Sequence, residues 1–315
     1  MPLPPTPLDR LLSDGAVPRS FDERYGDGLS LTVSFGGGGL FFVAWQIAYL
    51  SELAAGGVDI TGAQRVVGTS AGSLVATVTT TGRLRRVRTE LAALARVPAV
   101  LALLAPAADL RPSQLRALGM FSEADAAEPD TVRAIGHAAL AAATPSAARL
   151  RRSTAIVTGR GKLAHESLLI TAVDTYSAER CVLSASAGTT LAAATAASSA
   201  VPGLFAPQPV GDRHLMDGGV SGTGVHLDLL AGARRTLVLS LSDGTEPGPG
   251  MMTSPPGAFL VERAALEATG TEVFARSPEP VEITELMEPA AVPRALAMGA
   301  RQARADVAEL RTFWR

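Results

Sequence analysis

The chain has 315 residues, of which 47 % are hydrophobic and 18 % charged, which is enough apolar material for an α/β domain whose sheet is covered on both faces. A formal net charge of −2 leaves no basic excess for neutralising phosphates, so we expect no nucleic-acid partner. Cys181 is the only cysteine, which excludes an intramolecular disulfide and fits a reducing, cytoplasmic setting.

The chain begins with a polar, proline-rich segment, residues 1–28, that we interpret as an N-terminal extension. It lacks a basic start followed by an apolar run, so we expect no secretion signal. Two apolar stretches come nearest to a membrane span. Residues 40–50 are too few to cross a bilayer, and residues 91–110 are interrupted by one arginine and two prolines. We therefore expect a cytoplasmic protein that contacts a membrane at most peripherally.

Two strand-turn-helix units open the folded part of the chain. A strand predicted over 29–35 is followed by four glycines and a buried helix over 40–57. A second strand over 63–68 leads through a short turn into a helix over 71–82. Successive units of this kind indicate a parallel sheet with right-handed crossovers.

The middle of the chain, about 91–152, is rich in alanine and leucine without alternation, and we interpret it as a helical, cap-like insertion. The later part of the chain is predicted to form a hairpin of strands at 167–175 and 180–186, followed by a helix over 190–199 with a proline-rich loop. A short strand at 214–217 and a core strand at 234–242 come next. A loop at 243–257 and a closing amphipathic helix at 293–314 follow. Together they predict one α/β domain over 29–315, with three α/β/α layers and a mostly parallel central sheet.

A G-x-S-x-G pattern, "GTSAG", lies between the second strand and its helix, with Ser70 bracketed by Gly68 and Gly72. A strained turn of this kind exposes the serine hydroxyl at the N-terminus of the helix, where negative charge is stabilised. We interpret Ser70 as a nucleophile. The alternative is a serine that only caps the helix.

The four consecutive glycines, Gly36, Gly37, Gly38 and Gly39, follow the neighbouring strand. Their amides can face the same site as the serine, and glycine permits both positive φ angles and a close approach of substrate. A nucleotide-binding loop is the rival interpretation, but the G-x-x-x-x-G-K-[ST] spacing is missing. We therefore expect these glycines to form an oxyanion hole.

The sequence does not identify the general base directly. An α/β-hydrolase would carry a catalytic histidine on a late loop, but the last of the four histidines, His226, is followed by 89 residues (315 − 226). Asp217 follows a short strand in the turn "MDGG", and partial burial would raise its pKa enough for it to act as the base. His214 lies near it in sequence and could contact the site. Lys162, the only lysine, is a weaker candidate in polar surroundings. No cluster has metal-ligand spacing, so we expect neither metal nor cofactor.

These motifs resemble those of the patatin-like phospholipases. That family has a glycine-rich oxyanion loop, a G-x-S-x-G turn and a later D-G-[GA] turn, and the chain offers "GGGG", "GTSAG" and "DGG" in that order. The segment "ASSAVPGLFAP" is also similar to the family's S-x-x-x-P-x-x-F-x-P block. The resemblance covers about residues 29–241. It implies a patatin-like fold, a Ser70–Asp217 dyad and lipid acyl hydrolysis without a cofactor.

The chain departs from the family at two places. Leu40 and Phe41 stand where many members carry a basic residue after the glycines, which puts electrostatic help from a side chain in doubt. After "DGG" the chain reads "VSGTGV" where the family often has N-x-P.

The expected reaction is attack of Ser70 on an ester carbonyl while Asp217 accepts its proton. Leu40, Phe41, Phe42 and Trp45 could line an acyl groove, although core packing explains them equally well. Phospholipids, lysophospholipids and neutral glycerides all fit as substrates. Two alternatives stay open: an inactive lipid-binding or interaction module, and a soluble esterase or acyltransferase for small acyl groups. The sequence does not indicate an oligomeric state.

Overall fold

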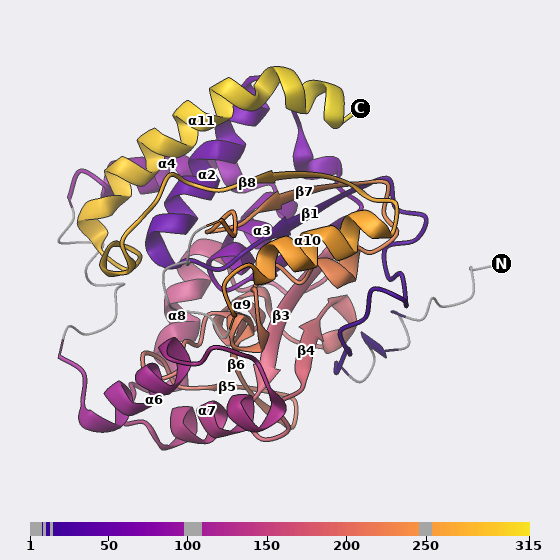
Figure 1. Ribbon diagram of the computed structural model, residues 1–315. Helices are drawn as coiled ribbons and strands as arrows, with labels where there is room; N and C mark the ends of the chain where they lie inside the picture. Colours follow the sequence, from indigo (N-terminus) through magenta and orange to yellow (C-terminus); the bar gives the residue numbers. More distant parts are fainter. Residues whose placement is uncertain (1–7, 9–10, 13–14, 98–108, 246–253) are drawn as a thin grey trace.

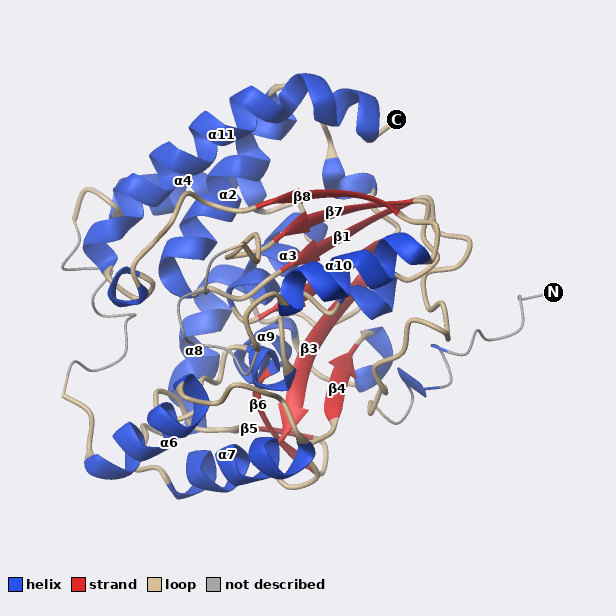
Figure 2. Cartoon of the chain, in the orientation of Figure 1, coloured by secondary structure: helices blue, strands red, loops and turns tan. Residues whose placement is uncertain are grey.

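The computed structural model describes residues 8, 11–12, 15–97, 109–245 and 254–315. In this part of the chain a sheet of eight strands runs through the middle of the molecule, with helices on both sides (Figures 1 and 2). The strand order is β5-β6-β3-β2-β1-β7-β8, and β4 pairs with β3 outside this path. The strands are β1 (Leu31–Phe35), β2 (Arg65–Thr69), β3 (Leu168–Asp174), β4 (Arg180–Leu183), β5 (Gln208–Val210), β6 (Arg213–Asp217), β7 (Arg235–Leu239) and β8 (Glu272–Arg276).

The sheet is mixed and mostly parallel, as expected. Neighbours among β3, β2, β1, β7 and β8 run parallel, whereas β4 and β6 are antiparallel to β3 and β5 is antiparallel to β6. In the β1–β2 ladder Phe35 lies opposite Gly68. Because parallel strands end at the same edge of a sheet, the glycine loop after β1 and the turn after β2 begin side by side.

Two layers of helices cover the sheet. The α-helices are α2 (Gly39–Ala55), α3 (Ala71–Thr80), α4 (Leu84–Leu94), α6 (Pro112–Ser122), α7 (Pro129–Ala141), α8 (Ala147–Thr158), α9 (Leu191–Ser198), α10 (Ala258–Ala268) and α11 (Val292–Phe313). Helix α11 runs along α2 on one face, and α10 lies in front of the other face (Figure 1). The insertion between α4 and β3 is helical in its described part, and its residues 98–108 lie outside the described chain.

Alternation along the strands divides the core between the two faces. Val66 packs in the cluster that contains α2, α3 and α11, whereas Val67 packs in the opposite cluster with α10 and the N-terminal segment. Helix α2 is buried on nearly all sides because α11 and α3 cover it. Its two polar aromatic groups are satisfied by α11, since Trp45 Nε1 donates to Gln302 Oε1 at 2.6 Å and Tyr49 Oη donates to Asp306 Oδ2 at 2.7 Å.

Three described elements were not predicted from the sequence. Strand β8 is a half-exposed edge strand, and β5 spans three residues inside the expected proline-rich loop, so neither carries a clear alternating pattern. Helix α10 follows directly on the expected loop at 243–257, of which residues 246–253 lie outside the described chain. Within the described residues, no helix is both long and apolar enough to cross a membrane.

Candidate active site

Ser70 occupies a sharp turn between β2 and α3, with φ 53° and ψ −120°. A non-glycine residue rarely adopts this conformation, so the turn holds Ser70 under backbone strain. The flanking glycines make the turn sterically possible. A Cβ atom at Gly68 would lie 2.7 Å from the Gly72 carbonyl oxygen, and one at Gly72 would collide with the carbonyl of Phe35. The pattern read from the sequence is therefore a packing requirement.

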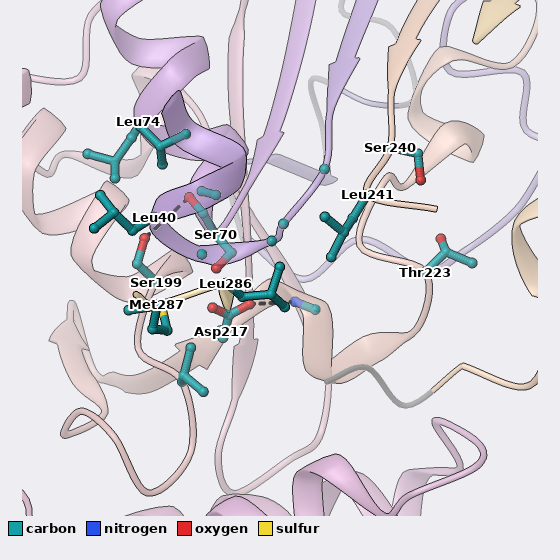
Figure 3. A pocket seen from close by; sticks show the side chains of 18 of the residues that line it. Leu40, Ser70, Leu74, Ser199, Asp217, Thr223, Ser240, Leu241, Leu286 and Met287 are labelled. Carbon is teal, nitrogen blue, oxygen red and sulfur yellow. Dashed lines mark hydrogen bonds between the residues drawn. The ribbon is translucent and has the colours of Figure 1, made fainter. Parts of the chain in front are cut away.

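Two serines at the end of α9 hold the Ser70 backbone in place. The Ser70 amide donates to Ser198 Oγ at 2.8 Å, and Ser199 Oγ donates to the Ser70 carbonyl at 3.3 Å (Figure 3). Ser73 Oγ donates to the same carbonyl at 2.6 Å. Ser198 and Ser199 belong to the "ASSAVPGLFAP" block, to which sequence analysis assigned no role. The contacts show that this block holds the backbone of the Ser70 turn.

Asp217 is the last residue of β6 and is only 3 % exposed. Its Oδ1 accepts from the Gly219 amide at 2.8 Å, and its side chain and that of Ser70 point toward each other (Figure 3). Burial raises the pKa of Asp217 to about 7, an effect that the Ser70 hydroxyl and the Gly219 amide oppose. Asp217 Oδ2 is buried without a hydrogen-bond partner among the described residues. This oxygen is therefore available to receive a proton.

The glycine loop connects β1 to α2 beside Ser70. The Gly36 amide donates to the Leu239 carbonyl at 2.9 Å, so it is already occupied by the sheet. In the described residues, the amides of Gly37, Gly38 and Gly39 form no backbone hydrogen bond of this kind. The expected oxyanion role does not fit the Gly36 amide, and the amides of Gly37, Gly38 and Gly39 are the candidates for it.

Gly39 offers a direct test of the loop. Its φ is 67°, and a Cβ there would lie 2.5 Å from the Leu286 carbonyl oxygen, so Gly39→Ala should distort the amides and lower kcat by about tenfold to a hundredfold. The measurement is steady-state ester hydrolysis. The control is Gly62→Ala, because a Cβ at Gly62 meets open space. Equal kcat for both variants would show that the loop takes no part.

An apolar cavity of about 360 Å³ lies over these groups. Both Ser70 and Asp217 line it, together with all four glycines of the loop. Apolar side chains from several helices and loops form much of the wall: Leu40, Val43, Leu74, Val87, Leu91, Phe121, Leu150, Val157, Val201, Phe205, Leu241, Phe259, Leu286 and Met287. The cavity can therefore hold an acyl chain beside Ser70.

Of the α2 residues considered for the acyl groove, only Leu40 lines the cavity. Phe41, Phe42 and Trp45 are fully buried, and Trp45 stacks between Phe42 and Tyr49 with ring centroids 5.3 and 5.1 Å apart. Their positions on α2 face the sheet and α11, so core packing explains them. The walls supplied by α10 and by residues 286 and 287 were not anticipated, because no local pattern links these distant segments to the serine.

Neither His214 nor Lys162 lines the cavity that contains Ser70 and Asp217. His214 is exposed, and its ring lies 6.0 Å from that of Tyr176 in an edge contact. His137, His165 and Lys162 are exposed as well. Among the residues that the structure describes, no group of three or more His, Cys, Asp or Glu side chains is arranged to bind a metal.

His226 belongs to a buried network beneath the turn that follows Asp217. Arg180 forms two 2.7 Å hydrogen bonds with the Asp228 carboxylate, and His226 Nδ1 lies 3.3 Å from Arg180 and 3.2 Å from Arg19. Burial and the two guanidinium groups hold the pKa of His226 well below its ordinary value. His226 is therefore a neutral structural residue, and sequence analysis gave no signal for the network.

The sequence matches the model of one known protein family. The family model described as patatin-like phospholipase matches residues 33–228, which is more than half of the chain and includes both Ser70 and Asp217. The chain belongs to the patatin-like phospholipase family. No curated protein matches the sequence.

Two solved structures are similar to the chain at low sequence identity. VipD from Legionella pneumophila is 12 % identical with a TM-score of 0.40, and the match covers 93 % of this chain and 68 % of VipD. The type III effector protein ExoU is 14 % identical with a TM-score of 0.33, and the match covers 87 % of this chain and 53 % of ExoU. The chain thus spans about half the length of ExoU.

Proposed function

We propose that this patatin-like protein hydrolyses carboxylic esters of lipids through a Ser70–Asp217 dyad. The observation that carries the proposal is the strained Ser70 turn facing a buried, partner-poor carboxyl group at the base of an apolar cavity. Family membership supports a lipid substrate. Contact with a membrane surface, where such substrates reside, is part of the same proposal.

In the acylation step, Ser70 Oγ attacks the ester carbonyl carbon and Asp217 accepts the hydroxyl proton. The carbonyl oxygen becomes negatively charged, and the amides of Gly37, Gly38 and Gly39 stabilise it. Collapse of the tetrahedral intermediate breaks the ester C–O bond, and Asp217 returns the proton to the leaving alkoxide. The products are an acyl-serine and a free alcohol.

In the deacylation step, water replaces the alcohol. Asp217 takes a proton from the water, the resulting hydroxide attacks the acyl-serine, and the same amides bind the second oxyanion. Ser70 regains its proton from Asp217 as the fatty acid leaves. One group therefore acts as base and then acid in each half-reaction, which requires a pKa near the working pH.

The dyad predicts a specific pH dependence. Asp217 acts as a base only when ionised, and its pKa is about 7, so kcat/KM should fall about tenfold per pH unit well below pH 7 and level off above it. The measurement is kcat/KM for a soluble p-nitrophenyl ester between about pH 5 and about pH 9. A flat profile across this range would contradict Asp217 as the base.

The apolar wall separates this proposal from the small-acyl esterase alternative. A cavity of this size and lining should favour p-nitrophenyl octanoate over p-nitrophenyl acetate in kcat/KM by at least about tenfold, because added methylenes are buried on binding. Equal or faster acetate hydrolysis would favour the small-acyl enzyme. No hydrolysis of either ester by folded protein would favour the lipid-binding module.

A further inference from the structure

The cavity around the dyad has two chemically different ends. Leu40 and Leu74 lie on one side of Ser70, whereas Thr223 and Ser240 lie on the other (Figure 3). The first end continues along α4 and α8, whose Val87, Leu91, Leu150 and Val157 line it together with the hydroxyl groups of Ser153, Thr154 and Ser199. The second end is bounded by the loops after β6 and β7 and the start of α10. The acyl chain fits the first end, so the alcohol part of the ester falls in the second.

The second end presents four neutral hydroxyl groups beside apolar side chains of the same segments, Leu241, Pro255 and Phe259; the hydroxyls belong to Thr223, Ser240, Ser242 and Ser254. Several of them keep hydrogen-bonding capacity for a ligand. Ser254 Oγ is buried without a partner among the described atoms. Ser242 Oγ accepts from the Gly244 amide at 3.0 Å, which leaves its O–H free to donate. Such groups match the donors and acceptors of a polyol.

Thr223 is oriented by a buried carboxyl group. Its Oγ1 is hydrogen-bonded to Glu262 Oε2, and Glu262 Oε1 accepts from the Leu227 amide at 2.7 Å. The threonine proton is therefore directed at Glu262, so its lone pairs are left to accept a hydrogen bond from a ligand hydroxyl. A ligand that can donate, as a free hydroxyl group can, is favoured at this position.

A cation is missing where a phosphate would need one. Among the described residues, no Lys, Arg or His lines the cavity, and Asp217 is the only charged side chain in the lining. Residues 98–108 and 246–253 contain no Lys, Arg or His in their sequence. Arg294 lies near Phe41, but it pairs with Glu285 at 2.6 Å and does not line the cavity. Burying a phosphodiester without a paired cation is unfavourable.

The start of α10 does not change this conclusion. A helix N-terminus supplies about half a positive charge, and α10 itself carries the Glu262 carboxyl group that is bonded to Thr223. The Arg19 guanidinium lies beneath Gly222, next to the Thr223 turn, and is directed at His226.

We propose that the preferred substrate is an acyl ester of an uncharged polyol, a neutral acylglycerol, and that phospholipids are poor substrates. This inference rests on the proposed hydrolase function. The test compares dihexanoylglycerol with dihexanoylphosphatidylcholine, both below their aggregation limits, because the two share acyl chains and glycerol and differ only in the phosphocholine group. We expect kcat/KM to be at least about tenfold higher for the acylglycerol.

A double variant tests the role of the hydroxyl end. Ser240→Ala combined with Ser242→Ala should lower the ratio of the two kcat/KM values by about threefold or more, because each lost hydroxyl weakens polyol binding. The control is Ser122→Ala, whose hydroxyl lies on α6 outside the cavity lining and which should keep the wild-type ratio. An unchanged ratio in the double variant would contradict the assigned role of these hydroxyls.

The two lipids distinguish a wrong substrate preference from an absent hydrolase activity. Equal or faster hydrolysis of dihexanoylphosphatidylcholine would overturn the preference for neutral esters while leaving the hydrolase intact. Hydrolysis of neither lipid, with Ser70 unlabelled by a fluorophosphonate, would overturn the hydrolase and the inference together.

Discussion

Replacing Asp217 by asparagine should lower kcat by about 10³-fold or more, because the amide cannot accept the Ser70 proton or return it to the leaving group. The substitution keeps the shape of the side chain and the acceptor oxygen that bonds to the Gly219 amide. The measurement is the burst and steady-state hydrolysis of a p-nitrophenyl ester. Both phases should slow, since the base acts in acylation and in deacylation.

A loss of activity in Asp217→Asn should not come from unfolding. The folded-state pKa of Asp217 is raised, so its ionised form destabilises the fold; this cost is absent below the unfolded pKa and grows as pH rises to about 7. At pH 8 the variant should therefore melt at or above the wild-type temperature. The matched control is Asp212→Asn, an exposed aspartate in the β5–β6 turn, which should keep full activity. An active Asp217→Asn enzyme would exclude the dyad.

Replacing Arg180 by methionine should lower the free energy of unfolding by about 3–5 kcal/mol, because the Asp228 carboxylate would remain buried without its guanidinium partner. Arg180 also donates to the carbonyls of Val17 and Pro18, so it ties the N-terminal segment to the region after the DGG turn. The measurement is chemical denaturation followed by fluorescence or circular dichroism.

Two further variants identify the cause of that loss. Combining Arg180→Met with Asp228→Leu removes the unpaired charge and should recover part of the stability. The control is Arg86→Met, which breaks an exposed i,i+4 pair with Glu90 at 2.7 Å and should cost less than about 0.5 kcal/mol. A similar small loss for Arg180→Met would show that the buried pair does not anchor this region.

The sequence was informative where local chemistry decides the structure. The strand-turn-helix order, the mostly parallel sheet and the hairpin of β3 and β4 follow from short apolar runs and their glycine boundaries. Gly68 and Gly72 could be recognised because steric crowding at the turn admits no side chain there. Aromatic residues make up only 4 % of the chain, yet Phe42, Trp45 and Tyr49 stack in a row on α2.

The parts that the sequence did not predict depend on contacts between distant segments. The Gly36 amide donates a hydrogen bond to the carbonyl of Leu239, 203 positions away (239 − 36), and no local sequence pattern indicates that bond. The Arg180–Asp228 pair and the hydroxyl end of the cavity likewise join segments that are far apart in the chain. Strand β8 was not predicted, because an edge strand with half-exposed residues lacks strict alternation of apolar and polar residues.

Ser70 should react as an activated nucleophile, and intact-mass analysis after exposure to a fluorophosphonate tests this most directly. The wild-type protein should gain one adduct, and the Ser70→Ala protein should gain none. Failure of the folded wild-type protein to react, or equal labelling of both proteins, would contradict the account.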